Sequence, residues 1–323
     1  MRRREFITLL GGAAVTWPLP LVAQQRTPRV GVLLTGVAPP SRDFELSHEL
    51  ARLGYIEGRN IIYEIRGADG DANRLPQLAR ELVAKNPEVI VESTTRAAVA
   101  LETETHDIPI VMMVLGDPIA LGLSNSMSRP SRNVTGFTIS SASLAAKRLE
   151  LLRELVPGLR KVAYLWVTDN PISKQFGEQV RIAGDALGIE LVSLPLTSSA
   201  DIPAAFTTAE KEHVKAVLIE PDPLTVRFSG TIVDECLLRD LPAMHGWPFE
   251  VRNGALISYG PGMVENFQHA AIYVDRILKG AKIAELPFEE PTEIKLAINL
   301  RTARSIGLVV PPTLLSRADE VIE

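Results

Sequence analysis

From Pro28 onward, short apolar runs alternate with longer segments in which apolar residues recur every three or four positions. The short runs are typical of strands buried on both faces, and the longer segments are typical of amphipathic helices. The first half of the pattern predicts strands over 29–35, 60–65, 88–92 and 108–115, separated by helices over 44–53, 74–85 and 94–105. Strands that alternate with helices in this way predict a parallel sheet covered on both faces.

The same alternation begins again after residue 160. It predicts strands over 161–167, 189–194, 215–220, 242–244 and 255–258, with helices over 173–187, 202–212, 226–239 and 264–278. The fold class predicted by two successive series is α/β, with two doubly wound parallel-sheet lobes joined by a hinge. We interpret 133–138 and a helix over 144–155 as the first crossover between lobes, and the tail over 287–299 as a last strand pair.

The length of the chain agrees with two lobes, because 323 residues exceed what one hydrophobic core usually organises. We expect an N-terminal lobe over 28–140 and 262–285, and a C-terminal lobe over 141–261 and 286–323. The chain would cross near 138–143, 259–262 and 285–291. A few residues at the ends of elements can absorb a closure motion, so these crossings predict the hinge.

The N-terminal residues 1–23 depart from this pattern. Three arginines at positions 2–4 precede a short apolar run over 9–15, and a small residue follows at Ala23. This order predicts a secretory signal cleaved near Ala23. The pair Arg3-Arg4, followed by Glu5-Phe6-Ile7, is typical of the twin-arginine type. A membrane anchor is the alternative, although the run is shorter than the ~20 residues that a spanning helix needs. We therefore expect export to the periplasm.

The net charge excludes one class of partner, and the cysteine content excludes an internal disulfide. The formal net charge is −5 at pH 7 and no basic cluster is present, which argues against nucleic acid as a partner. The single cysteine, Cys236, permits no internal disulfide and lies in an amphipathic pattern, so we expect a buried thiol.

Ligands of open parallel sheets bind beyond the carboxyl ends of the strands, where helix N-termini present free N–H groups. In the first lobe, the loops after the predicted strands supply the candidates Thr35, Ser93, Thr94, Thr95 and Asp117. Hydroxyls at a helix start suit a carboxylate, and ordinary helix capping explains Thr94 equally well. Asp117 would accept a hydrogen bond from a ligand ammonium or cap its own turn.

The corresponding loops of the second lobe supply a larger set. Its candidates are Trp166, Thr168, Asn170, Glu220, Asp222, His245, Trp247 and Tyr259. Both tryptophans fall at predicted strand ends, where an aromatic ring either stacks on a flat ligand or belongs to the core.

Motifs for catalysis are missing from the sequence. The five histidines stand far apart without metal-ligand spacing, and neither a Gly-x-Ser-x-Gly elbow nor a Walker-type phosphate loop occurs. We therefore predict ligand binding without chemistry, metal or cofactor. An exported enzyme that uses Ser93, Asp117 and His245 is the alternative.

Several blocks occur in a fixed order and spacing. They are LGYIEGRN at 53–60, DP at 117–118 followed by NVTG at 133–136, ISYG at 257–260 and ILKGAK at 277–282. Together they resemble the ABC transporter substrate-binding family often labelled tryptophan/tyrosine-type. The resemblance implies a type I periplasmic-binding fold, a closing cleft, and a membrane permease with its ATPase as partners. The block MHGW at 244–247 and the segment after Asn170-Pro171 differ from the pattern of that family.

These observations predict the periplasmic, monomeric substrate-binding component of an ABC importer. Its ligand would be a small zwitterion or carboxylate with a flat or apolar body, such as an aromatic amino acid. We expect the carboxylate at 93–95, the ammonium near Asp117 or Asp222, and the body against Trp166 or Trp247. Branched-chain amino acids and aromatic acids without an amine are alternative ligands, and a sensor subunit that presents its ligand to a membrane receptor is an alternative role.

Overall fold

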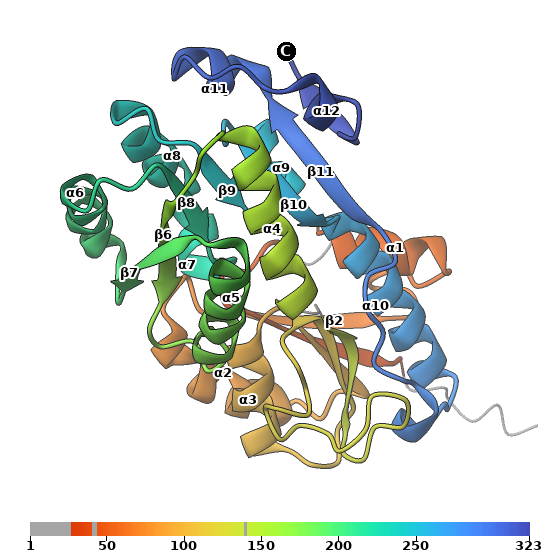
Figure 1. Cartoon of the computed structure of the whole chain (residues 1–323). Coiled ribbons are helices and arrows are strands. Elements are labelled where there is room, and N and C mark those ends of the chain that lie inside the picture. The colour runs from red at the N-terminus through yellow and green to blue at the C-terminus, as the bar shows by residue number, and fades with distance from the viewer. Residues whose placement is uncertain (1–26, 41–43, 139–140) are drawn as a thin grey trace, which may run out of the picture.

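The computed structural model describes residues 27–40, 44–138 and 141–323, so the predicted signal peptide lies outside the described residues. The chain forms two α/β lobes (Figure 1), one coloured red to yellow and the other green to blue. Helix α10 (Met263–Leu278) is blue but belongs to the first lobe. Within the described ranges, no helix is both long and apolar enough to cross a membrane.

A five-stranded parallel sheet in the order β2-β1-β3-β4-β5 organises the N-terminal lobe. Its strands are β1 (Arg29–Leu34), β2 (Ile62–Gly67), β3 (Val89–Glu92), β4 (Ile110–Leu115) and β5 (Val134–Thr138). Its helices are α1 (Glu45–Arg52), α2 (Leu75–Val83), α3 (Thr95–Glu104) and α10 (Met263–Leu278), with single-turn 3-10 helices η1 (Ala72–Arg74) and η3 (Ile283–Glu285).

Each face of this sheet is buried under its own pair of helices. Val30 and Val32 of β1 pack with α1 and α10, whereas Leu33 packs with α2 and α3. Successive side chains of a strand point to opposite faces, so the continuous apolar run of β1 supplies both cores. The blue helix α10 lies with the red-to-yellow lobe (Figure 1), although it comes late in the sequence.

A seven-stranded sheet in the order β12-β11-β10-β9-β8-β6-β7 organises the C-terminal lobe, and only its β10–β11 pair is antiparallel. The strands are β6 (Lys161–Val167), β7 (Glu190–Leu196), β8 (Ala216–Ile219), β9 (Ala243–His245), β10 (Ile257–Pro261), β11 (Ile294–Asn299) and β12 (Glu320–Ile322). The helices are α4 (Ser141–Leu155), α5 (Ser173–Leu187), η2 (Ser199–Asp201), α6 (Ile202–Lys211), α7 (Pro223–Arg227), α8 (Ser229–Leu238), α9 (Pro248–Arg252), α11 (Leu300–Ser305) and α12 (Pro312–Leu315).

The chain passes between the lobes three times. It crosses between β5 and α4, between β10 and α10, and between Glu289 and β11. The predicted first hinge segment includes residues 139–140, which lie outside the described residues. Glu289 stays with the N-terminal sheet, since its N–H donates to the Gly136 carbonyl (3.0 Å) and its own carbonyl accepts from the Thr138 N–H (2.9 Å). The segment 286–289, which we expected in the C-terminal lobe, therefore runs beside β5.

Three predicted elements differ in form from the structure. Residues 133–138 contain strand β5, because their apolar and β-branched side chains are buried on both faces of the sheet. The helix expected over 226–239 is divided into α7 and α8 at Phe228, whose backbone leaves the helical region (φ −104°, ψ 22°). The tail over 287–299 holds one strand, β11, which pairs with β10 and with β12 rather than with a neighbour in the same tail.

Candidate ligand-binding site

A cavity of about 500 Å³ lies between the two lobes, within the range usual for small-molecule sites. Loops at the carboxyl ends of β1, β2, β3 and β4 line one wall, and loops after β6, β8 and β9 with parts of α4 and α5 line the other. The N-terminal wall consists of Thr35, Gly36, Val37, Asp69, Gly70, Ser93, Thr94, Thr95 and Gly116. The C-terminal wall consists of Arg148, Asn170, Ile172, Phe176, Glu220, Pro221, Asp222, Pro223, Val226, Arg227, Trp247, Phe249 and Pro261.

Contacts across the cavity hold the lobes together. Arg96 at the start of α3 donates from Nη2 to Asp222 Oδ2 of the opposite lobe at 3.0 Å. Ile172 packs against Gly116 so closely that a Cβ added to this glycine would lie 1.3 Å from Ile172 Cδ1. The structure is therefore a closed arrangement of the two lobes.

The start of helix α3 forms the polar part of the N-terminal wall. Thr94 caps this helix, since its hydroxyl accepts from the Ala97 N–H (3.3 Å) and bonds to the Thr35 hydroxyl (2.8 Å). The Thr94 N–H donates to buried Glu92, whose pKa is raised well above its usual value because the side chain is buried. The hydroxyls of Ser93 and Thr95 form no hydrogen bond within the described part of the chain, so both are available to bind a ligand in the cavity.

Two buried carboxyl groups in the loop after β8 differ in their partners. Asp222 accepts from Arg96 and from Asn170 Nδ2 (2.9 Å) at one oxygen, and from the Leu224 N–H (2.8 Å) at the other. Among the described residues, the Glu220 carboxyl group accepts only from the neutral hydroxyls of Tyr164 (2.7 Å) and Ser173. Burial raises the pKa of Glu220 to about 7, against the opposing effect of these two hydrogen bonds.

Arg148 of α4 brings a positive charge to the same wall. It is buried, with 2% of its surface exposed, and it donates from Nε to the Tyr259 carbonyl (2.7 Å) and from Nη2 to the Gly246 carbonyl (3.3 Å). Burial lowers the pKa of Arg148 to about 10, partly offset by the nearby Glu250, so the guanidinium is charged at neutral pH.

Aromatic side chains complete the C-terminal wall. Trp247 is buried and stacks on Phe249, with ring centroids 6.5 Å apart and an angle of 25° between the planes. Phe176 of α5 is buried as well. The wall therefore combines one buried cation, two buried acids and flat apolar surface, which suits a small ligand with charged groups and an aromatic or apolar body.

The predicted site residues divide into two groups. Those that line the cavity are Thr35, Ser93, Thr94, Thr95, Asn170, Glu220, Asp222 and Trp247. Those that do not are Asp117, Trp166, Thr168, His245 and Tyr259. What any of them binds stays a prediction.

The residues outside the cavity have local roles. Asp117 caps its own turn, accepting from the N–H groups of Ile119 (2.8 Å) and Ala120 (3.3 Å). Trp166 packs on the core of its lobe and donates from Nε1 to the Ser193 hydroxyl (2.8 Å) on the neighbouring strand β7. The Thr168 hydroxyl donates to the Leu196 carbonyl (3.3 Å), and Tyr259 contributes its backbone carbonyl to Arg148.

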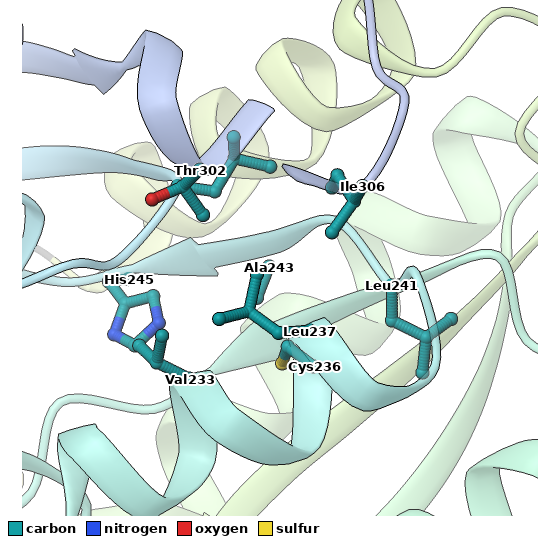
Figure 2. Close-up of a pocket in the computed structure, with 9 residues that line it drawn as sticks. Val233, Cys236, Leu237, Leu241, Ala243, His245, Thr302 and Ile306 are labelled. Carbon is teal, nitrogen blue, oxygen red and sulfur yellow. The ribbon is translucent and has the colours of Figure 1, made fainter. Parts of the chain in front are cut away.

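His245 lines a separate pocket of about 10 Å³, which Figure 2 shows with Cys236 and Thr302 around it. Its Nδ1 pairs with Glu250 Oε1 at 3.1 Å, and both side chains are buried. Of the three residues in the alternative enzyme, only Ser93 therefore lines the interlobe cavity. Within the described residues, no group of three His, Cys, Asp or Glu side chains could hold a metal ion.

Sequence reasoning missed Arg148, Phe176 and Arg227 among the lining residues. Arg148 had a recognisable signature, because Ala145, Arg148, Leu149 and Leu152 occupy one face of a helix and the other three are fully buried. An arginine on an apolar helix face indicates a buried charge with a specific purpose.

Comparisons with known proteins agree with this architecture. A structure from Streptococcus pneumoniae described as an ABC domain in complex with L-Trp superimposes with a TM-score of 0.84 and 24% identity, covering 92% of this chain and all of that one. A conserved domain protein from Vibrio cholerae superimposes with a TM-score of 0.85 and 25% identity, with the same coverage of both chains. Among curated sequences, a tyrosine-binding protein of Clostridioides difficile is 24% identical over 255 residues, which are 79% of this chain and 73% of the relative.

The predicted fold class and family resemblance are confirmed. The two lobes with parallel sheets have the type I periplasmic-binding fold of these structural neighbours. The family model described as ABC transporter substrate binding protein matches residues 42–322, which is most of the chain. The protein therefore belongs to the family of ABC transporter substrate-binding proteins.

Proposed function

We propose that this protein is the exported binding component of an ABC importer and captures an amino-acid-like zwitterion between its lobes. The observation that carries the proposal is the composition of the cavity. Hydroxyls at a helix start line one wall, while a buried cation, a buried acid without a cationic partner and stacked aromatic rings line the other. This set complements a carboxylate, an ammonium and a flat or apolar body.

The ligand carboxylate is proposed to contact the start of α3. The Ser93 and Thr95 hydroxyls and the first N–H groups of this ten-residue helix are available there. Free N–H groups and the helix dipole favour negative charge at such a position. Thr94 supports the helix start through its cap, so we expect Thr94 to act mainly by holding its neighbours in place.

The ligand ammonium is proposed to contact Glu220. Asp117 caps its own turn, and Asp222 is already bonded to Arg96 and Asn170. Glu220 bonds only to neutral hydroxyls, and an ammonium beside it would favour its ionised form.

The ligand body is proposed to lie against Trp247, Phe249 and Phe176. The names of similar proteins support an aromatic amino acid, since one is a tyrosine-binding protein and another was solved with L-Trp. At 24% identity these names guide the choice of ligands to test.

The family and the N-terminal sequence support proposals about export, partners and assembly. Substrate-binding proteins of ABC importers work outside the cytoplasm, which agrees with the twin-arginine-type signal over residues 1–23. We propose a permease and its ATPase as partners of a monomeric mature protein, and no chemical change of the ligand. A sensor subunit would use the same cavity and closure.

A thermal-shift screen of ligand-free protein tests the proposal. The panel contains amino acids, aromatic acids, sugars and nucleosides. Each bound compound is recovered, and mass spectrometry shows whether it is chemically unchanged. We expect amino acids to raise Tm, because a ligand at 100 times its Kd adds about 2.7 kcal/mol to the free energy of unfolding. A rise with sugars or nucleosides alone, or recovery of a chemically altered compound, would contradict the proposal.

A further inference from the structure

Arg148 is a buried cation without an ion-pair partner among the described residues, because the nearby Glu250 is bonded to His245 Nδ1 and to the Trp247 N–H. Its guanidinium is bonded to two backbone carbonyls, those of Tyr259 and Gly246, and it forms no ion pair with any residue in the described ranges. Buried charges in proteins are ordinarily paired, because removing a charge from water is costly. The missing partner is therefore expected to come from outside the chain.

The hydrogen bonds of Arg148 leave part of the guanidinium open. Nε and Nη2 donate to the carbonyls, whereas Nη1 has no acceptor among the described residues. Arg148 also lines the interlobe cavity. A planar guanidinium that is held in place and has free N–H groups is suited to bind a carboxylate.

Glu220 is a buried acid on the same wall, and it forms no ion pair among the described residues. It is buried and lines the cavity, but the groups bonded to it, Tyr164 and Ser173, carry no charge. The Tyr164 hydroxyl donates to Glu220 Oε2 at 2.7 Å. The other cavity acid, Asp222, is already paired with Arg96.

We infer that Arg148 determines specificity by pairing with the ligand carboxylate, while Glu220 pairs with its ammonium. This inference rests on the proposed function. The charges of the zwitterion are then both neutralised by the C-terminal wall, and the hydroxyls of Ser93 and Thr95 add neutral hydrogen bonds from the other lobe. A ligand with an ammonium but no carboxylate would leave Arg148 unpaired in the closed cavity.

A purely structural role for Arg148 makes a different prediction. Its bonds to Tyr259 and Gly246 connect α4 to the chain before the second crossing and to the loop that carries Trp247. If this were its whole role, a substitution would weaken all ligands by the same factor, whether or not they carry a carboxylate.

Calorimetry with L-tryptophan and L-tryptophanamide separates the two roles, because the amide keeps the ammonium and the ring but lacks the carboxylate. We expect wild type to prefer the acid by about 100-fold, as for other desolvated charge pairs. Arg148→Gln should lower this ratio to nearly one by weakening the acid alone, and Arg148→Lys should keep part of it. Arg153→Gln, at an exposed position of the same helix, is the control and should keep the full ratio.

Each outcome bears on a separate claim. Equal weakening of acid and amide by Arg148→Gln, in a variant whose Tm shows that it folds, would overturn the role of Arg148 and leave the proposed function intact. Affinities for both ligands that equal those of wild type would overturn it as well. If wild type binds neither L-tryptophan nor any other amino acid in the screen, the proposed function fails and this inference fails with it.

Discussion

The two walls of the cavity are built from different chemistry. The N-terminal wall consists of hydroxyls, glycines and the start of α3, with Asp69 as its one ionisable group. The backbone carbonyl of Asp69 accepts a hydrogen bond from Arg227 Nη1 of the other wall. The C-terminal wall holds the buried charges of Arg148, Glu220 and Asp222 together with the aromatic rings. Neutral donors suit many ligands, whereas buried charges accept only the complementary one. We therefore propose that the C-terminal lobe sets which ligand binds and that the N-terminal lobe closes over it.

Removing the charge of Glu220 is expected to have the largest effect. Glu220→Gln keeps the size of the side chain and its bond to Tyr164 but leaves a ligand ammonium without a counter-charge at a buried position. Loss of one member of a desolvated charge pair predicts about 100-fold weaker binding of L-tryptophan, measured by calorimetry. Ser193→Ala, at the hydroxyl that bonds to Trp166 outside the cavity, should leave affinity unchanged. Equal affinities for Glu220→Gln and wild type would show that the C-terminal wall does not bind the ammonium.

The pH dependence of binding should follow from the same group. The pKa of Glu220 is raised to about 7, so ligand affinity should increase about tenfold from pH 6 to pH 8 as the carboxylate forms. Binding near pH 7 should also release a proton, which calorimetry in buffers of different ionisation enthalpy detects. A flat profile in wild type, or the same slope in Glu220→Gln, would contradict this assignment.

Stability of the ligand-free protein should change with pH in the opposite direction. Folded Glu220 binds its proton more tightly than the unfolded chain, whose value is near the ordinary 4.5. Its contribution to the free energy of unfolding is therefore complete below pH 4.5 and is lost as pH rises to about 7. From pH 4.5 to pH 7, the free energy of unfolding of wild type, measured with urea, should therefore fall relative to that of Glu220→Gln. No relative change would argue against a protonated Glu220.

The ion pair across the cavity is expected to have an intermediate effect. Arg96→Met removes the ion pair that joins α3 to Asp222 of the opposite lobe. Asp222 is buried but keeps its hydrogen bonds from Asn170 Nδ2 and the Leu224 N–H, so a loss of about 1 kcal/mol, or about fivefold in affinity, is expected. Arg80→Met removes an exposed pair with Glu104 on the same lobe and is the control. Small-angle scattering should show that Arg96→Met needs more ligand to reach the compact form, and equal requirements in both variants would contradict this role.

The smallest effect is expected at the N-terminal wall. Ser93→Ala removes one neutral hydroxyl from the cavity, and the net value of such a hydrogen bond predicts about threefold weaker binding. Titration of L-tryptophan measures this change, with Ser128→Ala, at an exposed loop position, as the control. A loss as large as that of Glu220→Gln would mean that the N-terminal wall contributes to ligand choice as much as the C-terminal one.

Most of the fold could be predicted from the sequence, because periodicity and end signals are local. Helix α5 covers the predicted 173–187, and Gly188 ends it in the left-handed conformation (φ 64°) that glycine tolerates. The pairing of β11 with β12 could not be predicted in this way, since the two strands are separated by residues 300–319 and their contact has no local pattern.

The site was predicted less completely, because a strand end gives the position of a residue but not the direction of its side chain. Thr35 and Glu220 follow strands and line the cavity, as expected of the carboxyl edge of a sheet. Trp166 lies at a strand end as well, yet its ring points to Ser193 on the edge strand β7. Arg148 reaches the site from a helix by bonding a carbonyl 111 residues away, and this contact has no local pattern.

A crystal structure of the protein saturated with L-tryptophan tests the central claim most directly. We predict that the ligand lies inside the interlobe cavity, with its carboxylate about 2.7–2.9 Å from the Arg148 guanidinium and its ammonium bonded to Glu220. Its ring should lie against Trp247 and Phe249. A ligand bound outside this cavity, or inside it with no charged group beside Arg148 or Glu220, would contradict the account.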